Sequence, residues 1–306
     1  MKFTKMHGAG NDYIYINCFE EDIVPEEMID DIIAMSDRHK GIGSDGVIFI
    51  MPSKVADARM RMFNADGSEG KMCGNGIRCV GKYVYEHGIS HNNPLQIETA
   101  SGIKILNLEV VQGKAETVTV DMGNPILDPK SIPVDLDVEK VINYPLVVNN
   151  QEYLITCVSM GNPHCVIFTE GIDYLDLESI GPLFENNPIF PERTNAEFIE
   201  IIDDKTMKMR VWERGSGETL ACGTGASASV VAAIYNNIFT RDQEIEVILK
   251  GGELYITLTS DNHVFMRGSA TEVFTGEYKL KKVIVYKSQV KSTLTFYILN
   301  YSSNKK

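Results

Sequence analysis

The chain has 306 residues, 43% of them hydrophobic and 23% charged, and its formal net charge is −13. This length and apolar content predict about two globular domains. The acidic balance argues against nucleic acid or an anionic membrane as a partner, because both bind surfaces rich in Lys and Arg. The N-terminus carries no apolar signal core and no apolar run approaches the roughly 18 residues of a membrane span, so we expect a cytoplasmic protein.

The cysteines and histidines predict neither a disulfide framework nor a metal site. The chain contains six of each, without a Cys-x-x-Cys pair and without zinc-ligand spacing between the two residue types. Disulfide frameworks belong mainly to short secreted chains. We therefore expect free thiols and no bound metal.

Strand and helix signals follow one another in the same order twice along the chain. Alternating β-branched and aromatic residues predict the strands, and apolar residues at helical spacing predict the helices. The first half predicts a glycine-rich turn ending at Asn11, strand 13–17, helix 25–38, strands 46–51 and 58–64, Cys73, a helix to about 87 and strand 102–110. The second half predicts a turn with Asn162, strand 164–168, helix 174–185, strands 196–202 and 207–213, Cys222, a helix to about 236 and strand 253–259.

A direct alignment supports this duplication. Residues 60–76 match residues 209–225 at a constant offset of 149, with six of seventeen positions identical and no gap. The repeat predicts an α+β fold of two homologous domains, each a curved, mostly antiparallel and barrel-like β-sheet around a central α-helix. The expected boundaries are 1–121 with a returning segment at about 269–282 for the first domain, 122–268 for the second, and 283–306 for a C-terminal extension of unassigned role.

Cys73 and Cys222 occupy the same place in the two repeats, directly before a Gly-x-Gly sequence that starts a predicted helix. The first turn of a helix has unpaired backbone N–H groups and partial positive charge, which favour a carboxylate ligand and a thiolate. A helix terminus contributes only ~0.3–1 kcal/mol, too little to make a thiolate-rich site. A charged neighbour must therefore adjust the thiol pKa, and His164 and Glu213 are our candidates.

Two such corners that face each other across a cleft can act on one stereocentre. One thiolate removes an α-proton from one face, and the opposing thiol delivers a proton to the other face. We find no lysine in a convincing pyridoxal phosphate motif. The residues therefore predict an amino-acid epimerase or racemase that needs no cofactor and acts on a small-molecule substrate.

Several motifs in order resemble one enzyme family. They are Lys5–Asp12, Arg38–Gly46, Phe63–Glu69, Cys73–Arg78, Met160–His164, Arg193–Phe198, Val211–Thr219 and Ala221–Ala226. From about residue 1 to residue 280 the chain resembles the diaminopimelate epimerases. The resemblance implies the interconversion of L,L- and meso-diaminopimelate, on the route to lysine and peptidoglycan precursors.

The resemblance also implies roles for individual residues. Cys73 and Cys222 would be the acid/base pair, and His164 and Glu213 would adjust their pKa values. The implied substrate contacts are the side chains of Asn11, Asn64, Asn162, Asn195, Glu213 and Arg214 and the backbone donors at Gly74, Asn75, Gly223 and Thr224. Some family members place a glutamine contact where this chain has Gly46, so that contact is not carried over.

Two other functions stay open at this point. A racemase of related architecture, for histidine or proline, would use the same cysteine pair but would not need a clamp for a second carboxylate. A thiol-based redox sensor or an amino-acid binding module would use the pair for a reversible disulfide, although no redox motif is present. An exposed sheet edge favours a homodimer in any of these cases.

Overall fold

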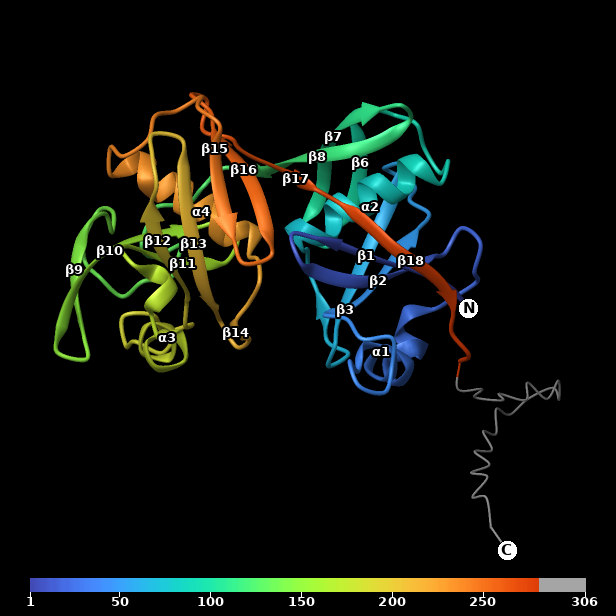
Figure 1. The fold of residues 1–306 in the computed structure, drawn as a ribbon, viewed down its shortest axis with the longest axis horizontal. Helices are drawn as coiled ribbons and strands as arrows, with labels where there is room; N and C mark the ends of the chain where they lie inside the picture. Colours follow the sequence, from blue (N-terminus) through green and yellow to red (C-terminus); the bar gives the residue numbers. More distant parts are fainter. Residues whose placement is uncertain (281–306) are drawn as a thin grey trace, which may run out of the picture.

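The computed structural model describes residues 1–280, and the predicted extension 283–306 lies outside the described residues. Two lobes lie side by side, each built mainly of strands with few helices (Figure 1). The predicted α+β class with curved, mostly antiparallel sheets is therefore confirmed. In the described part of the chain, no helix is long and apolar enough to cross a membrane.

The first lobe starts at the N-terminus and takes its last strand from the end of the described chain. Its elements are β1 Lys2–Gly8, β2 Asn11–Asn17, a 3-10 turn Pro25–Met28, α1 Ile29–Ser36, β3 Gly46–Met51, β4 Ala58–Asn64, β5 Glu69–Gly70, α2 Gly74–Glu86, β6 Leu95–Thr99, β7 Gly102–Val111, β8 Lys114–Gly123 and β18 Thr271–Glu277. β18 pairs antiparallel with β1, and β1 pairs antiparallel with β2. The returning strand therefore lies beside the first strand of the chain.

The second lobe is continuous in sequence. Its elements are β9 Tyr144–Val148, β10 Gln151–Ser159, β11 Pro163–Phe168, a 3-10 turn Ile172–Tyr174, α3 Leu177–Glu185, β12 Asn195–Ile201, β13 Thr206–Glu213, β14 Gly217–Glu218, α4 Gly223–Tyr235, β15 Ile245–Leu249, β16 Gly252–Leu258 and β17 Val264–Ser269. The helices predicted at 25–38 and 174–185 are shorter, because each begins as a separate 3-10 turn.

The two lobes repeat the same strand order. Hydrogen bonding runs β18-β1-β2-β3-β4-β6-β7-β8 in the first lobe and β9-β10-β11-β12-β13-β15-β16-β17 in the second. The parallel pairs fall at corresponding places, β2–β3 with β11–β12 and β4–β6 with β13–β15. Each sheet is curved and open, and the antiparallel pairing of β8 with β17 joins the lobes.

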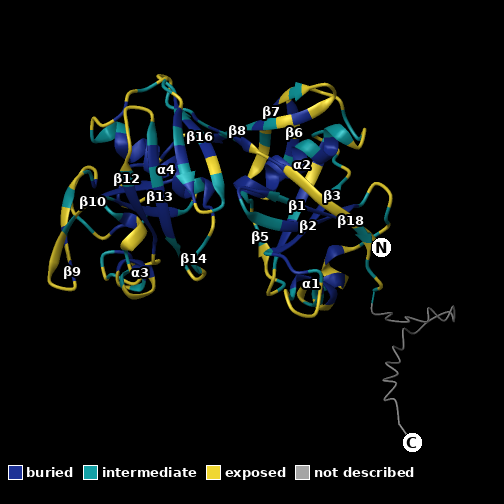
Figure 2. Ribbon diagram, in the orientation of Figure 1, coloured by how far each residue is buried: buried dark blue, intermediate teal, exposed yellow. Residues whose placement is uncertain are grey.

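A helix occupies the interior of each lobe. α2 and α4 are separated by the offset of 149 residues that the sequence predicts. α4 consists of Gly, Ala, Ser and Val in its first turns and is buried along almost its whole length, so strands approach it from several sides (Figure 2). α2 carries larger side chains and packs against β1, β2 and β8. Both helices direct their N-termini to the space between the lobes, which places Cys73 and Cys222 there.

Candidate active site

Each cysteine caps the N-terminus of its central helix. Cys73 precedes α2 and Cys222 precedes α4, both in extended backbone conformation. The Sγ atom of Cys73 accepts a hydrogen bond from the Gly76 N–H at 3.3 Å, and Cys222 Sγ accepts one from the Gly225 N–H at 3.3 Å. Ser, Thr, Asp and Asn oxygens usually fill this capping role. Here the cysteine sulfur atoms fill it, so each thiol lies at the positive end of a helix.

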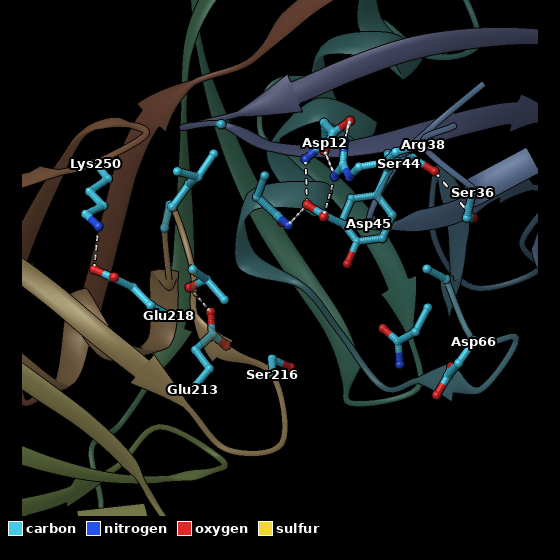
Figure 3. Close-up of a pocket in the computed structure, with 18 residues that line it drawn as sticks. Asp12, Ser36, Arg38, Ser44, Asp45, Asp66, Glu213, Ser216, Glu218 and Lys250 are labelled. Carbon is cyan, nitrogen blue, oxygen red and sulfur yellow. Dashed lines mark hydrogen bonds and ion pairs between the residues drawn. The ribbon is translucent and has the colours of Figure 1, made fainter. Parts of the chain in front are cut away.

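Both cysteines line one cavity of about 480 Å³ between the lobes. A wider opening of about 1100 Å³ shares Asn11, Tyr13, Glu213 and Ala221 with this cavity, so the two form a single cleft. Figure 3 shows charged side chains on both sides of the opening, with Asp12, Arg38 and Asp45 opposite Glu213, Glu218 and Lys250.

Ion pairs hold the Asn11 amide on the first-lobe wall of the cleft. Arg38 Nη2 lies 2.7 Å from carboxylate oxygens of both Asp12 and Asp45 (Figure 3). Asp45 Oδ2 accepts a hydrogen bond of 2.6 Å from Asn11 Nδ2. The amide oxygen of Asn11 therefore faces the cysteine, and Cys73 Sγ donates to Asn11 Oδ1 at 3.2 Å.

On the second-lobe wall of the cleft, a histidine holds the amide of Asn162. His164 is fully buried, with Nδ1 at 2.6 Å from Glu197 Oε1 and Nε2 at 3.0 Å from Asn162 Oδ1. Cys165 pairs with Ala196 on β12, and Ile14 pairs with Val47 on β3. Because Ala196 and Val47 are equivalent at the offset of 149, the residue before Cys165, His164, corresponds to the residue before Ile14, Tyr13. Asn162 therefore corresponds to Asn11, two residues before the ring in each repeat.

Glu213 lies at the end of β13, lines both parts of the cleft and acts electrostatically on both cysteines. Thr219 Oγ1 donates to Glu213 Oε1 at 2.5 Å. Burial raises the pKa of the Glu213 carboxyl, while the Thr219 hydrogen bond and the nearby His164 lower it in part. A buried carboxyl in this place can receive an ammonium group, which would compensate its charge.

Burial dominates the acidity of both cysteines. It raises the pKa of the Cys73 thiol, while hydrogen bonds from the N–H groups of Gly76 and Asn75 lower this pKa in part. It raises the pKa of the Cys222 thiol well above its ordinary value, and the carboxylates of Glu213 and Glu197 raise it further. The N–H groups at the helix termini thus lower the thiol pKa values as expected, but burial is the larger effect and Glu213 raises these pKa values in the free protein. The roles of His164 and Glu213 during the reaction stay predictions.

Most of the predicted contact residues lie in the cleft. The inner cavity is lined by Asn11, Gly74, Asn75, Asn162, Glu213, Arg214, Gly223 and Thr224, and the opening by Asn64. Asn195 does not line either part. Its side chain is buried, donates to the Pro163 carbonyl at 2.7 Å and accepts from the Arg214 N–H at 2.9 Å. Asn195 therefore positions the backbone of Arg214, and its direct contact with the substrate stays a prediction.

Sequence reasoning missed three buried polar residues around the cysteines. Tyr13 lines the cleft, Glu197 binds His164, and the fully buried guanidinium of Arg78 donates to the Gly74 carbonyl at 3.2 Å. The spacing Asn-x-Tyr and Asn-x-His could have paired Tyr13 with His164. A glutamate or arginine within an otherwise apolar stretch was the available signal for the other two.

Known proteins resemble this chain over most of its length. The family model for diaminopimelate epimerase matches residues 3–127 and 156–273. The chain belongs to the diaminopimelate epimerase family. Curated members from Acetivibrio thermocellus and Desulfovibrio desulfuricans are 54% and 56% identical over 285 and 286 residues, which is 92% and 91% of this chain and 100% and 98% of theirs. A member from Methanococcus maripaludis is 51% identical over 278 residues, 90% of this chain and 99% of its own.

Solved structures outside this family share the fold. A phenazine biosynthesis protein from Bacillus anthracis superposes with a TM-score of 0.65 at 19% identity and covers 92% of this chain and 99% of its own. A hydroxyproline epimerase from Agrobacterium vitis gives a TM-score of 0.65 at 14% identity, with 90% and 91% covered. At these identities the likeness shows the fold alone.

Proposed function

We propose that this family member is a diaminopimelate epimerase that interconverts L,L- and meso-diaminopimelate, with Cys73 and Cys222 as the acid/base pair. The observation that carries the proposal is that two repeat-equivalent cysteines cap helices whose N-termini line the same cavity. Curated relatives of the same name, 54% and 56% identical to it, cover nearly the whole described chain.

The reaction requires one proton transfer on each face of the α-carbon. The thiolate of one cysteine takes the α-proton and becomes a thiol, and the C–H electron pair stays on carbon as a carbanion. The thiol of the other cysteine then protonates the opposite face and becomes a thiolate. Positioned acid/base groups of this kind contribute typically ~10²–10⁴ in rate, and backbone donors that stabilise the developing negative charge contribute more.

The lining residues suit a substrate with two carboxylates and two ammonium groups. Backbone N–H groups at the starts of α2 and α4, from Gly74, Asn75, Gly223 and Thr224, suit the α-carboxylate at the reacting carbon. Arg214 suits a carboxylate as a forked donor, and Glu213 suits an ammonium. An ammonium beside Glu213 would also offset the negative charge that raises the pKa of both thiols.

The direct test is proton exchange. The reduced protein is incubated in D₂O with L,L-diaminopimelate, without added cofactor, and NMR and chiral chromatography follow the product. We expect deuterium at one α-carbon together with the meso isomer. Absence of both from the reduced, folded protein would refute the proposal. L-Proline and L-histidine serve as comparison substrates. Faster exchange with either one than with diaminopimelate would indicate a racemase for that amino acid instead.

Variants of three cysteines test the assignment of the pair. Cys73→Ala and Cys222→Ala should each abolish formation of the second isomer, because each removes the only acid or base on one face. Cys79→Ala is the matched control, since Cys79 is buried within α2 and lies outside the cleft lining. Full activity in either active-site variant would remove the two-base mechanism.

The cellular location and the assembly are also proposals. We propose a cytoplasmic homodimer that forms at the edge of the first-lobe sheet. The exposed side chains of Val273 and Phe274 on β18 support this edge as the contact. Sedimentation at micromolar concentration tests it, and a monomer under those conditions would contradict it.

A further inference from the structure

Glu197 is a carboxylic acid in a place that the other repeat fills with an apolar side chain. It lies on β12 between Ala196 and Phe198, and all three residues are fully buried. The equivalent residue in the first lobe, at the offset of 149, is Ile48. Burying a carboxylate without full pairing is costly, so its retention beneath the active site points to a role there.

The contacts of Glu197 are directed at one ring nitrogen. Glu197 Oε1 lies 2.6 Å from His164 Nδ1, and neither side chain is exposed to solvent. The second oxygen, Oε2, is buried and has no hydrogen-bond partner. An ionised carboxylate accepts hydrogen bonds and donates none. This contact therefore places a proton on Nδ1 and leaves Nε2 as the nitrogen that faces the cleft.

The hydrogen bonds continue from His164 to the cavity wall. His164 Nε2 lies 3.0 Å from Asn162 Oδ1, and Asn162 lines the cavity with the cysteines. An amide oxygen also only accepts, so in this arrangement both ring nitrogens of His164 carry a proton. Nε2–H donates to Asn162 Oδ1, and the NH₂ group of Asn162 is the end left for a ligand. The charged groups that act on His164 are Glu197 from β12 and Glu213 from β13.

Glu197 also lies beside the first turn of α4, which Cys222 caps. A Cβ atom placed on Gly225, in the first turn of α4, would lie 2.8 Å from Glu197 Oε1 and 3.2 Å from Cys222 Sγ. The carboxylate thus contacts the same helical turn that caps the thiol. One side chain reaches both the histidine that holds Asn162 and the turn that holds Cys222.

We infer that Glu197 is a positioning residue for the proposed epimerisation, which holds a proton on Nδ1 of His164 so that both ring nitrogens donate, and through the ring fixes the orientation of the Asn162 amide toward the substrate. The inference rests on the proposed function for its kinetic consequence. The protonation of the two ring nitrogens is a property of the free protein and can be measured without any substrate. Carboxylate partners of functional histidines fix ring orientation and tautomer in the same way at metal sites.

The first experiment is ¹⁵N NMR of the full chain labelled at histidine, with the His164 signals assigned by their loss in His164→Asn. We expect the His164 Nδ1 signal of a protonated nitrogen in the wild-type protein at neutral pH. Glu197→Leu removes the acceptor of Nδ1–H and should leave a ring that no longer carries a proton on both nitrogens. An unprotonated Nδ1 in the wild-type protein would overturn the inference whether or not the protein is an epimerase.

The second experiment is kinetic. Glu197→Leu should lower kcat/KM for diaminopimelate by about 10–100-fold, by analogy with carboxylates that orient histidine ligands. Glu197→Gln should recover part of this loss, because its amide oxygen can still accept the Nδ1–H. Glu200→Leu, the same change three residues along β12, is the matched control and should keep the wild-type rate.

A double-mutant comparison separates positioning from a general loss of structure. If Glu197 acts through His164, the double variant His164→Asn/Glu197→Leu should be no slower than His164→Asn alone. Independent, multiplicative losses would overturn the inference. Unchanged activity in Glu197→Leu, with the protein shown to be folded, would do the same. An inactive wild-type protein that shows the protonated Nδ1 would refute the proposed epimerase function and leave the protonation of His164 standing.

Discussion

The glycines three residues after the two cysteines offer a matched pair of substitutions. Gly76 and Gly225 are equivalent at the offset of 149, and each faces the side chain at the equivalent place on the neighbouring strand. A Cβ on Gly76 would lie 2.7 Å from Ile48 Cδ1, and a Cβ on Gly225 would lie 2.8 Å from Glu197 Oε1. The same added methyl group therefore meets a flexible methyl in one lobe and a hydrogen-bonded carboxylate in the other.

The expected costs differ because the two neighbours differ in freedom. The end of Ile48 can change rotamer, and alanine in place of glycine in a helix gains about 0.5–1 kcal/mol, which offsets much of the crowding. Glu197 is held by His164 at 2.6 Å. Moving it weakens a hydrogen bond to a charged group, worth about 1.5–3 kcal/mol, in addition to overpacking of about 1–3 kcal/mol. We expect Gly225→Ala to be at least about 2 kcal/mol less stable than Gly76→Ala.

Urea unfolding measures this difference, and the chain provides a local reporter. Trp212 is the single tryptophan and lies on β13 in the same lobe as Gly225. Its fluorescence follows the second lobe, while far-ultraviolet circular dichroism follows both. Gly225→Ala should lower the free energy of unfolding in the fluorescence transition and should also lower epimerase activity. Equal stability of the two variants would refute the reasoning, because it would mean that Glu197 is free to move.

Two further predictions concern charge. After burial, the Glu213 carboxylate is a main cause of the raised pKa of the Cys222 thiol, so Glu213→Gln should speed its alkylation by iodoacetamide at neutral pH while lowering kcat/KM; unchanged alkylation would contradict this. Burial alone would raise the pKa of Asp12, but hydrogen bonds from Arg38 and Lys5 lower it on balance. This carboxyl therefore stabilises the fold above its unfolded pKa of about 3.9, and the stabilisation is lost as pH falls. Between about pH 5 and pH 3, the urea midpoint should fall more steeply in the wild type than in Asp12→Asn, and parallel curves would count against the effect.

Features set by local sequence could be predicted, and features set by contacts between distant strands could not. The starts of α2 and α4 follow from Cys-Gly-x-Gly, because capping and glycine freedom act within one helical turn. The buried hydrogen bonds of Asn195 could not be predicted, because its partners are Pro163, 32 residues away, and Arg214, 19 residues away. No local pattern distinguishes an asparagine that contacts a ligand from one that holds a strand.

Glu197 is a second residue whose surroundings could not be predicted from the local sequence. A glutamate in the sequence Ala-Glu-Phe-Ile would normally be expected on the exposed face of a strand. It is buried because α4 covers that face and because His164, from the parallel neighbour β11, pairs with it. The burial that raises the thiol pKa values could not be predicted either, because it depends on distant parts of the chain that pack around each cysteine and not on the residues next to it.

The pairing of β18 with β1 has a consequence for synthesis of the chain on the ribosome. The second lobe is contiguous from β9 to β17 and can complete its sheet as soon as Ser269 has emerged. The first lobe must wait for Thr271–Glu277 before the free edge of β1 is covered. Domains usually fold in the order of their synthesis. In this protein the lobe that begins the chain is completed last, so a nascent chain that stops before β18 exposes the open edge of its own first strand.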